Sequence, residues 1–191
     1  MELQKFGIKF FFKPNDSYPS RDFIPEFHKW IQSSSVPEHM LIDVIDYSHI
    51  PDGPGIMLIA HEGHFSLDKE NNQPGMLYMR RAELEGSFED RFESVFSTSL
   101  HAAQMLINNE LGSEMHLLPD SFRFTTNDRL LAENNEENRD LLSNTIHKIL
   151  ETKHPNKQWV FEDFALEGER LAFSIKFQDD TNILENTLKE G

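Results

Sequence analysis

The stretch EHMLIDVIDYSHIPDGPGIMLIAHEGHF, residues 38–65, decides the fold that this sequence predicts. Its two apolar runs predict strands at about Met40–Ser48 and Gly55–His61, and the residues between them, Pro51–Gly55, are typical of a tight turn. The glycines there lack the spacing of a phosphate-binding loop, and a strand rather than a helix follows them. We therefore expect a hairpin around which the other elements pack.

A strand and a helix are predicted before this hairpin. The strand is indicated by apolar residues at every second position, Phe6, Ile8, Phe10 and Phe12. The helix should begin after Ser20, a residue type favoured as an N-cap, and its apolar positions have helical spacing. These positions are Phe23, Ile24, Phe27, Trp30 and Ile31.

A further strand and a long helix are predicted after the hairpin. The residues His61–His64 are expected to lie on a strand, and a polar loop over residues 68–74 then leads to a further strand, Met76–Met79. Gly86 and Ser87 precede the longest predicted helix. Gly112 should end it in a left-handed conformation, which glycine adopts without a steric penalty.

The pattern then begins again. Phe122, Phe124, Asn127 and Asp128 reproduce the spacing of Phe10, Phe12, Asn15 and Asp16 as F-x-F-x-x-N-D. A third helix, Glu136–Thr152, is expected to bury Leu141, Leu142, Thr145 and Ile149. A second hairpin should follow, with Trp159, Phe161 and Phe164 on one strand, a turn at Leu166–Glu169, and alternating apolar residues from Leu171 to Phe177 on the other.

This order of elements predicts an α+β fold made of two β-α-β-β units, the first extended by one strand and by the long linking helix. Because one such unit leaves a sheet face or edge open, the two units are expected to share a core. We therefore predict a single domain of mainly antiparallel sheet over residues 1–180, with halves of about 1–112 and 113–180. A polar tail, residues 181–191, should follow it.

Composition limits the function classes. The 191 residues include 18 Lys and Arg against 33 Asp and Glu, a formal net charge of -15, which repels the phosphates of nucleic acids and anionic lipids. No apolar run approaches the roughly 20 residues that span a bilayer. The absence of cysteine and of a secretory signal pattern predicts a cytoplasmic location. Neither nucleic acid nor a membrane is an expected partner.

A histidine beside a carboxylate is the first candidate site. In the predicted hairpin Asp43 and Asp46 fall near His61, and a carboxylate that orients an imidazole prepares it as a general base. Arg80, Arg81 and His49 would then bind an anionic substrate. The alternative is that both aspartates are charges at a sheet edge that discourage aggregation.

Metal binding is the second candidate. His61, Glu62 and His64 carry ligand atoms, and a bulge at Gly63 would turn both histidines to one side. Paired modules of this order resemble the vicinal oxygen chelate enzymes such as the glyoxalases. The resemblance covers most of the chain and implies paired sheets that enclose a metal. That family takes its ligands from the first and last strands of each module, where the first strands here carry phenylalanines.

No complete catalytic constellation and no cofactor motif is present, so the sequence predicts no cofactor and leaves enzymatic activity open. The first interpretation is a non-catalytic, acidic binding or accessory protein that self-associates as a homodimer, with a small-molecule ligand also open. The second is a small-molecule enzyme with a histidine and carboxylate site at the end of the central hairpin. The third is a metal protein with vicinal-oxygen-chelate-like architecture.

Overall fold

A computed structural model of the chain describes residues 2–13, 20–155, 157–163 and 169–178. Within these residues the strands are β1 (Phe6–Phe12), β2 (Leu41–Tyr47), β3 (Gly55–Ala60), β4 (Gly63–Asp68), β5 (Gly75–Arg80), β6 (Leu117–Thr126), β7 (Trp159–Asp163) and β8 (Ala172–Phe177). The α-helices are α1 (Ile24–Ser33), α2 (Phe88–Ile107) and α3 (Glu136–Lys153). Short 3-10 turns are η1 (Ser20–Phe23), η2 (Glu70–Asn72) and η3 (Glu110–Gly112).

The strands form one sheet in the order β2-β3-β4-β5-β1-β6-β8-β7, and every pair of neighbours in it is antiparallel. The predicted α+β class with a mainly antiparallel sheet is therefore confirmed. Strands of both predicted halves belong to this one sheet, because β1 and β6 are neighbours at its centre. The domain limits at residues 1–180 stay a prediction.

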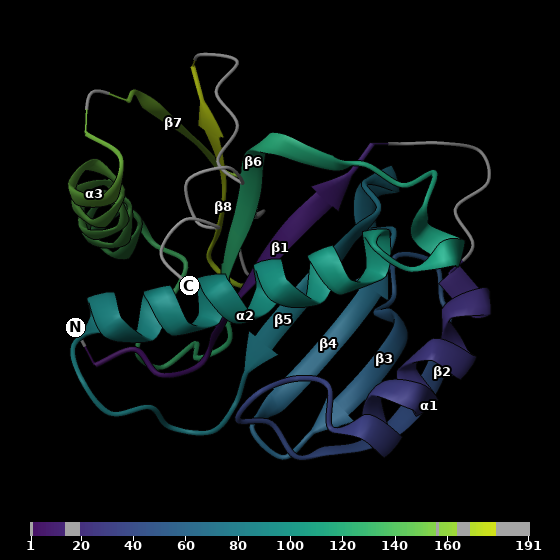
Figure 1. Cartoon of the computed structure of the whole chain (residues 1–191). Helices are drawn as coiled ribbons and strands as arrows, with labels where there is room; N and C mark the ends of the chain where they lie inside the picture. Colours follow the sequence, from purple (N-terminus) through teal and green to yellow (C-terminus); the bar gives the residue numbers. More distant parts are fainter. Residues whose placement is uncertain (1, 14–19, 156, 164–168, 179–191) are drawn as a thin grey trace.

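All three α-helices cover the same face of the sheet. One core cluster contains buried side chains from each helix together with every second residue of the central strands. Figure 1 shows α2 crossing this face, where it contacts β1 and β5. Phe92 of α2 packs 6.4 Å from the Phe122 ring and 6.3 Å from the Phe124 ring, both on β6. Aromatic pairs at such separations add to the stabilisation from burial.

Two local predictions are confirmed by geometry. Ser87 is the N-cap of α2 and forms a capping box with Asp90, in which each residue's side chain accepts the other's backbone amide. The hairpin of residues 38–65 is present as β2 and β3. In addition, Phe10 and Phe122, which match in the F-x-F pattern, are Cα partners on β1 and β6.

The main difference is β4, which the sequence analysis missed. The chain turns at His61 and Glu62, and Gly63 begins a strand that pairs with β3 and β5. Phe65 and Leu67 belong to the core there and alternate with Ser66 and Asp68, so the period of two that indicates a strand is present in this stretch of the sequence. The first half is therefore a strand, a helix and a four-stranded meander.

Two predicted helix ends are wrong. Helix α1 begins at Ile24 after the turn η1, and its N-cap is Phe23 rather than Ser20. Helix α2 ends before Asn108, while Gly112 lies in η3 and does not have a positive φ. The helix ends through Asn108, which is right-handed, and Asn109, which is extended, so no left-handed glycine is needed.

The predicted buried face of α3 is partly wrong. Leu141 is 53% exposed, and the buried residues of the helix are Leu142, Ile146, Ile149 and Leu150. Because these four residues face the core, Thr145 lies to the side of the buried face and is only partly buried.

Several predictions fall outside the described residues: Asn15 and Asp16, Phe164, most of the turn Leu166–Glu169, and the tail 181–191. Among the helices of the described part of the chain, none has both the length and the apolar character of a membrane span.

Candidate functional site

The predicted histidine site lies at the turn between β3 and β4. His61 is exposed there, and its Nδ1 is 3.6 Å from Oε1 of Glu62. The other Glu62 oxygen accepts a hydrogen bond of 2.9 Å from the Met40 amide. Partial burial acts to raise the pKa of Glu62, but hydrogen bonds from backbone amides, that of Met40 first, lower it overall. This carboxylate thus ties the start of β2 to the turn.

Asp43 and Asp46 lie on β2, which is one end of the sheet. Asp43 is the Cα partner of Ile59 and accepts a 2.8 Å hydrogen bond from the Val44 amide. Asp46 lies further from the β3–β4 turn and accepts bonds from both the hydroxyl and the amide of Ser48, which lower its pKa. Both carboxylates therefore bind backbone groups of the edge strand. Their pairing with His61 stays a prediction.

His64 is on β4, where its Cα partner is Met79 of β5, and it faces the side of the sheet away from α1, α2 and α3. Burial lowers its pKa to about 4, with further lowering by Arg81 and Arg170. In the described part of the chain no three His, Asp or Glu side chains form a group that could hold a metal. The metal hypothesis for His61, Glu62 and His64 thus has no support from this geometry.

The predicted anion-binding residues do not form one site. Arg80 is only 9% exposed and donates to the carbonyl oxygens of Ala82 and Glu83, at 3.0 and 3.4 Å. Arg81 is exposed beyond the end of β5. His49 lies at the opposite end of the hairpin, with its ring 6.5 Å from that of Tyr47. Their role in substrate binding stays a prediction.

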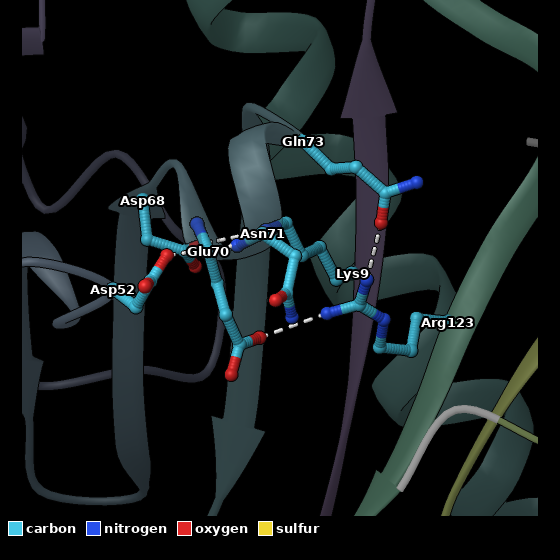
Figure 2. A network of polar contacts seen from close by, with 7 residues as sticks. All are labelled: Lys9, Asp52, Asp68, Glu70, Asn71, Gln73 and Arg123. Atoms are coloured by element: carbon cyan, nitrogen blue, oxygen red, sulfur yellow. Dashed lines mark hydrogen bonds and ion pairs between the residues drawn. The ribbon is translucent and has the colours of Figure 1, made fainter.

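A buried ionic network lies on the sheet face away from α1, α2 and α3, and the sequence analysis missed it (Figure 2). Lys9 and Arg123 are direct Cα partners on β1 and β6, and each side chain is only 2% exposed. Lys9 Nζ lies 2.5 Å from Oδ1 of Asp68. Arg123 donates through Nη1 to Glu70 at 2.8 Å and through Nη2 to Gln73 at 2.6 Å.

Charge balance explains how the two cations are tolerated. Like charges on directly opposite residues of a sheet destabilise it, and burial adds a desolvation penalty. Burial indeed lowers the pKa of both Lys9 and Arg123, while Asp68 and Glu70 act in the opposite direction. With two cations and two carboxylates the network is formally neutral. The side chains of Lys9 and Arg123 also lie against the Phe11 ring, at 5.6 and 5.1 Å.

The segment that supplies these carboxylates has a strained backbone. Asn71 and Asn72 in η2 have φ of 52° and 57°, and Asp52 in the β2–β3 turn has φ of 51°. The Asn71 amide donates to the Asp52 carboxylate at 3.0 Å, so the strained turns are bonded to each other. Consecutive left-handed residues other than glycine persist only where the surroundings hold them, and such positions are often functional.

A cleft of about 480 Å³ lies between the start of α3 and the β7–β8 hairpin. One wall is a polar stripe of α3, and the aromatic side comprises Phe161 and Phe173, which pack at 6.1 Å. The polar stripe consists of Glu136, Arg139, Asp140 and Ser143. These residues have the i, i+3, i+4, i+7 spacing of one helix face, beside the stripe that α3 buries. Polar side chains there leave the space against the sheet unfilled.

Comparison with known proteins gives no assignment. No model of a known protein family matches the chain. Searches of curated proteins and of solved structures likewise gave no significant match. The geometry of the two sites is therefore the basis for a function.

Proposed function

We propose that this protein is a non-catalytic binding protein that holds a small aromatic cation in the cleft between α3 and the β7–β8 hairpin. The observation that carries the proposal is the cleft itself. Its volume of about 480 Å³ is within the range of roughly 300–1,000 Å³ that is usual for small-molecule sites. Four polar side chains and two aromatic rings line it, and groups of both kinds are found in such sites.

The charges of the wall favour a cation. Glu136 and Asp140 are exposed carboxylates on it, whereas Arg139 donates from Nε to the side chain of Asn134 at 2.8 Å. A protonated amine on a flat ring would bind a carboxylate while its ring packs on Phe161, which is partly exposed, whereas Phe173 is buried beneath it. The net charge of -15 also attracts cations from a distance.

The fluorescence of Trp159 provides a direct test of ligand binding in the cleft. Trp159 precedes Phe161 by two residues and therefore faces the same side of β7. In a Trp30→Phe background it is the sole tryptophan. We expect phenethylamine to change its fluorescence saturably, and 2-phenylethanol and 3-phenylpropionate to bind at least about tenfold more weakly, a difference of about 1.4 kcal/mol.

Asp140→Asn should weaken phenethylamine binding by about twofold to fivefold, as expected for loss of one exposed ion pair. Glu137→Gln is the matched control, since it removes a carboxylate from the same helix but from outside the cleft. Equal binding of the three compounds, or an equal effect of the two variants, would refute the proposal.

We also propose that the protein forms a homodimer, as the sequence predicts. The proposal is supported by two apolar side chains at the β2 edge of the sheet, Met40 and Ile42, which are 59% and 54% exposed. Sedimentation velocity should show a dimer that the Met40→Ser/Ile42→Ser variant dissociates. A wild-type monomer at micromolar concentration would rule it out.

We also propose that the fold contains two related units. Each central strand pairs with the last strand of its own half, β1 with β5 and β6 with β8, and the matched residues Phe10 and Phe122 are direct partners. Both phenylalanines are fully buried. Phe10→Leu and Phe122→Leu should therefore lower stability by similar amounts.

A further inference from the structure

The guanidinium group of Arg123 is shared between the two ends of a single turn. Nη1 donates to Glu70 and Nη2 to Gln73, the residues that flank Asn71 and Asn72. The two outer nitrogens of a guanidinium form a planar fork that fits one carboxylate or one phosphate in a bidentate manner. Here Nη1 and Nη2 bind two separate side chains, whereas a single oxyanion could accept hydrogen bonds from both nitrogens.

Asp68 and Glu70, the two carboxylates of the network, differ in how readily an anion from solution could replace them. The Asp68 side chain is 5% exposed, and its Oδ1 also accepts the Glu70 amide at 2.9 Å. The Glu70 side chain is 46% exposed, although the arginine that it binds is buried. The Glu70 end of the network thus opens to solvent, and a solute can compete with it there.

Strain in the turn favours its release. Two consecutive left-handed asparagines, Asn71 and Asn72, keep the backbone in a sparsely populated conformation that the surrounding contacts must hold. The contacts that hold the turn in this shape include Arg123 at both ends and Asp52 at the middle. Occupation of the guanidinium by another anion would remove both end contacts at once.

We infer that Arg123 is an oxyanion site, for a small carboxylate or a phosphate group, at which the ligand displaces Glu70 and Gln73 and releases the turn 70–73 from the sheet. Glu70 is the built-in competitor, and it keeps the site closed until such an anion is present. The site is independent of the α3 cleft, because it lies on the opposite face of the sheet. Lys9 adds a second positive charge but stays bound to Asp68.

Isothermal titration with inorganic phosphate and with acetate, each against chloride at equal ionic strength, measures the competition. Glu70→Gln keeps an acceptor but removes the competing charge, so it should tighten binding of the preferred anion by about tenfold if the turn is closed nine-tenths of the time. Glu110→Gln, an exposed carboxylate in η3, should leave binding unchanged. Preference for phosphate or for acetate identifies which oxyanion chemistry the site takes.

Arg123→Lys in the Glu70→Gln background retains the charge and loses the fork, and it should reduce the affinity by at least tenfold. Gln73→Ala provides a second route that leaves the arginine intact, and it too should tighten binding relative to the wild type. If neither Glu70→Gln nor Gln73→Ala tightens binding of either anion, Arg123 is a structural residue only.

Release of the turn has its own readout. Trypsin cleaves after lysine, and Lys69 is exposed directly before η2. The preferred anion should accelerate cleavage at Lys69 in the wild type, while cleavage at Lys29, in helix α1, should not change. Binding without any change at Lys69 would show that the turn stays in place and would overturn the release step.

Discussion

Replacing Lys9 by methionine removes the ammonium that binds Asp68 and keeps a side chain of similar length. Loss of one partner of a buried ion pair costs about 3–5 kcal/mol, since the other charge is left without compensation. Two features place this variant near the lower end: Asp68 keeps its hydrogen bond from the Glu70 amide, and the repulsion between Lys9 and Arg123 disappears. We expect a loss of about 3 kcal/mol, which for a chain of this length lowers Tm by roughly 6–12 °C.

Urea unfolding of Lys9→Met, Asp68→Asn and the double variant measures the coupling between the two residues. The double variant should recover much of the loss, with a coupling free energy of about 2 kcal/mol. Lys29→Met is the control, because Lys29 forms a 3.0 Å ion pair with Glu26 but is 71% exposed, so its loss should be below about 1 kcal/mol. A Lys9→Met loss no larger than the control, with no coupling, would refute the importance of the buried pair.

Three further predictions concern single residues. Burial keeps the pKa of His64 near 4. The folded imidazole therefore stays neutral while the unfolded one protonates below about 6.5. The free energy of unfolding should fall by up to about 3 kcal/mol as the pH drops from 6.5 to 4, and His64→Gln, unlike exposed His28→Gln, should flatten that slope in urea titrations. Ser87→Ala removes the α2 cap and should cost about 1 kcal/mol in thermal unfolding, whereas no loss would show that Asp90 alone suffices. Gly55→Ala should prevent the β2–β3 turn from closing and lower Tm sharply. Gly55 has φ of +62°, and an added Cβ would lie 2.1 Å from a β4 carbonyl oxygen. An unchanged Tm would contradict this prediction.

The sequence alone determined the features that depend on neighbours along the chain. Alternating phenylalanines placed Phe10 and Phe122 on the helix-covered face, the apolar spacing after Ser87 gave α2, and the Pro-Gly run gave the central turn. These signals are local, since the periods of 2 and 3.6 residues follow from backbone geometry. The edge position of Asp43 and Asp46 was likewise among the alternatives that the pattern allowed.

Only the tertiary structure decided whether side chains on the sheet face away from α1, α2 and α3 are buried or exposed to solvent. Lys9 alternates with phenylalanines and has the pattern of a solvated strand residue. It is nevertheless buried, and it binds Asp68, which lies 59 residues further along the chain at the end of β4. The same holds for the α3 cleft, which exists because a polar stripe faces Phe161 and Phe173 across a hairpin later in the chain. Periodicity fixes which side of a strand a residue takes, but strand order and long-range turns fix whether that side meets water or protein.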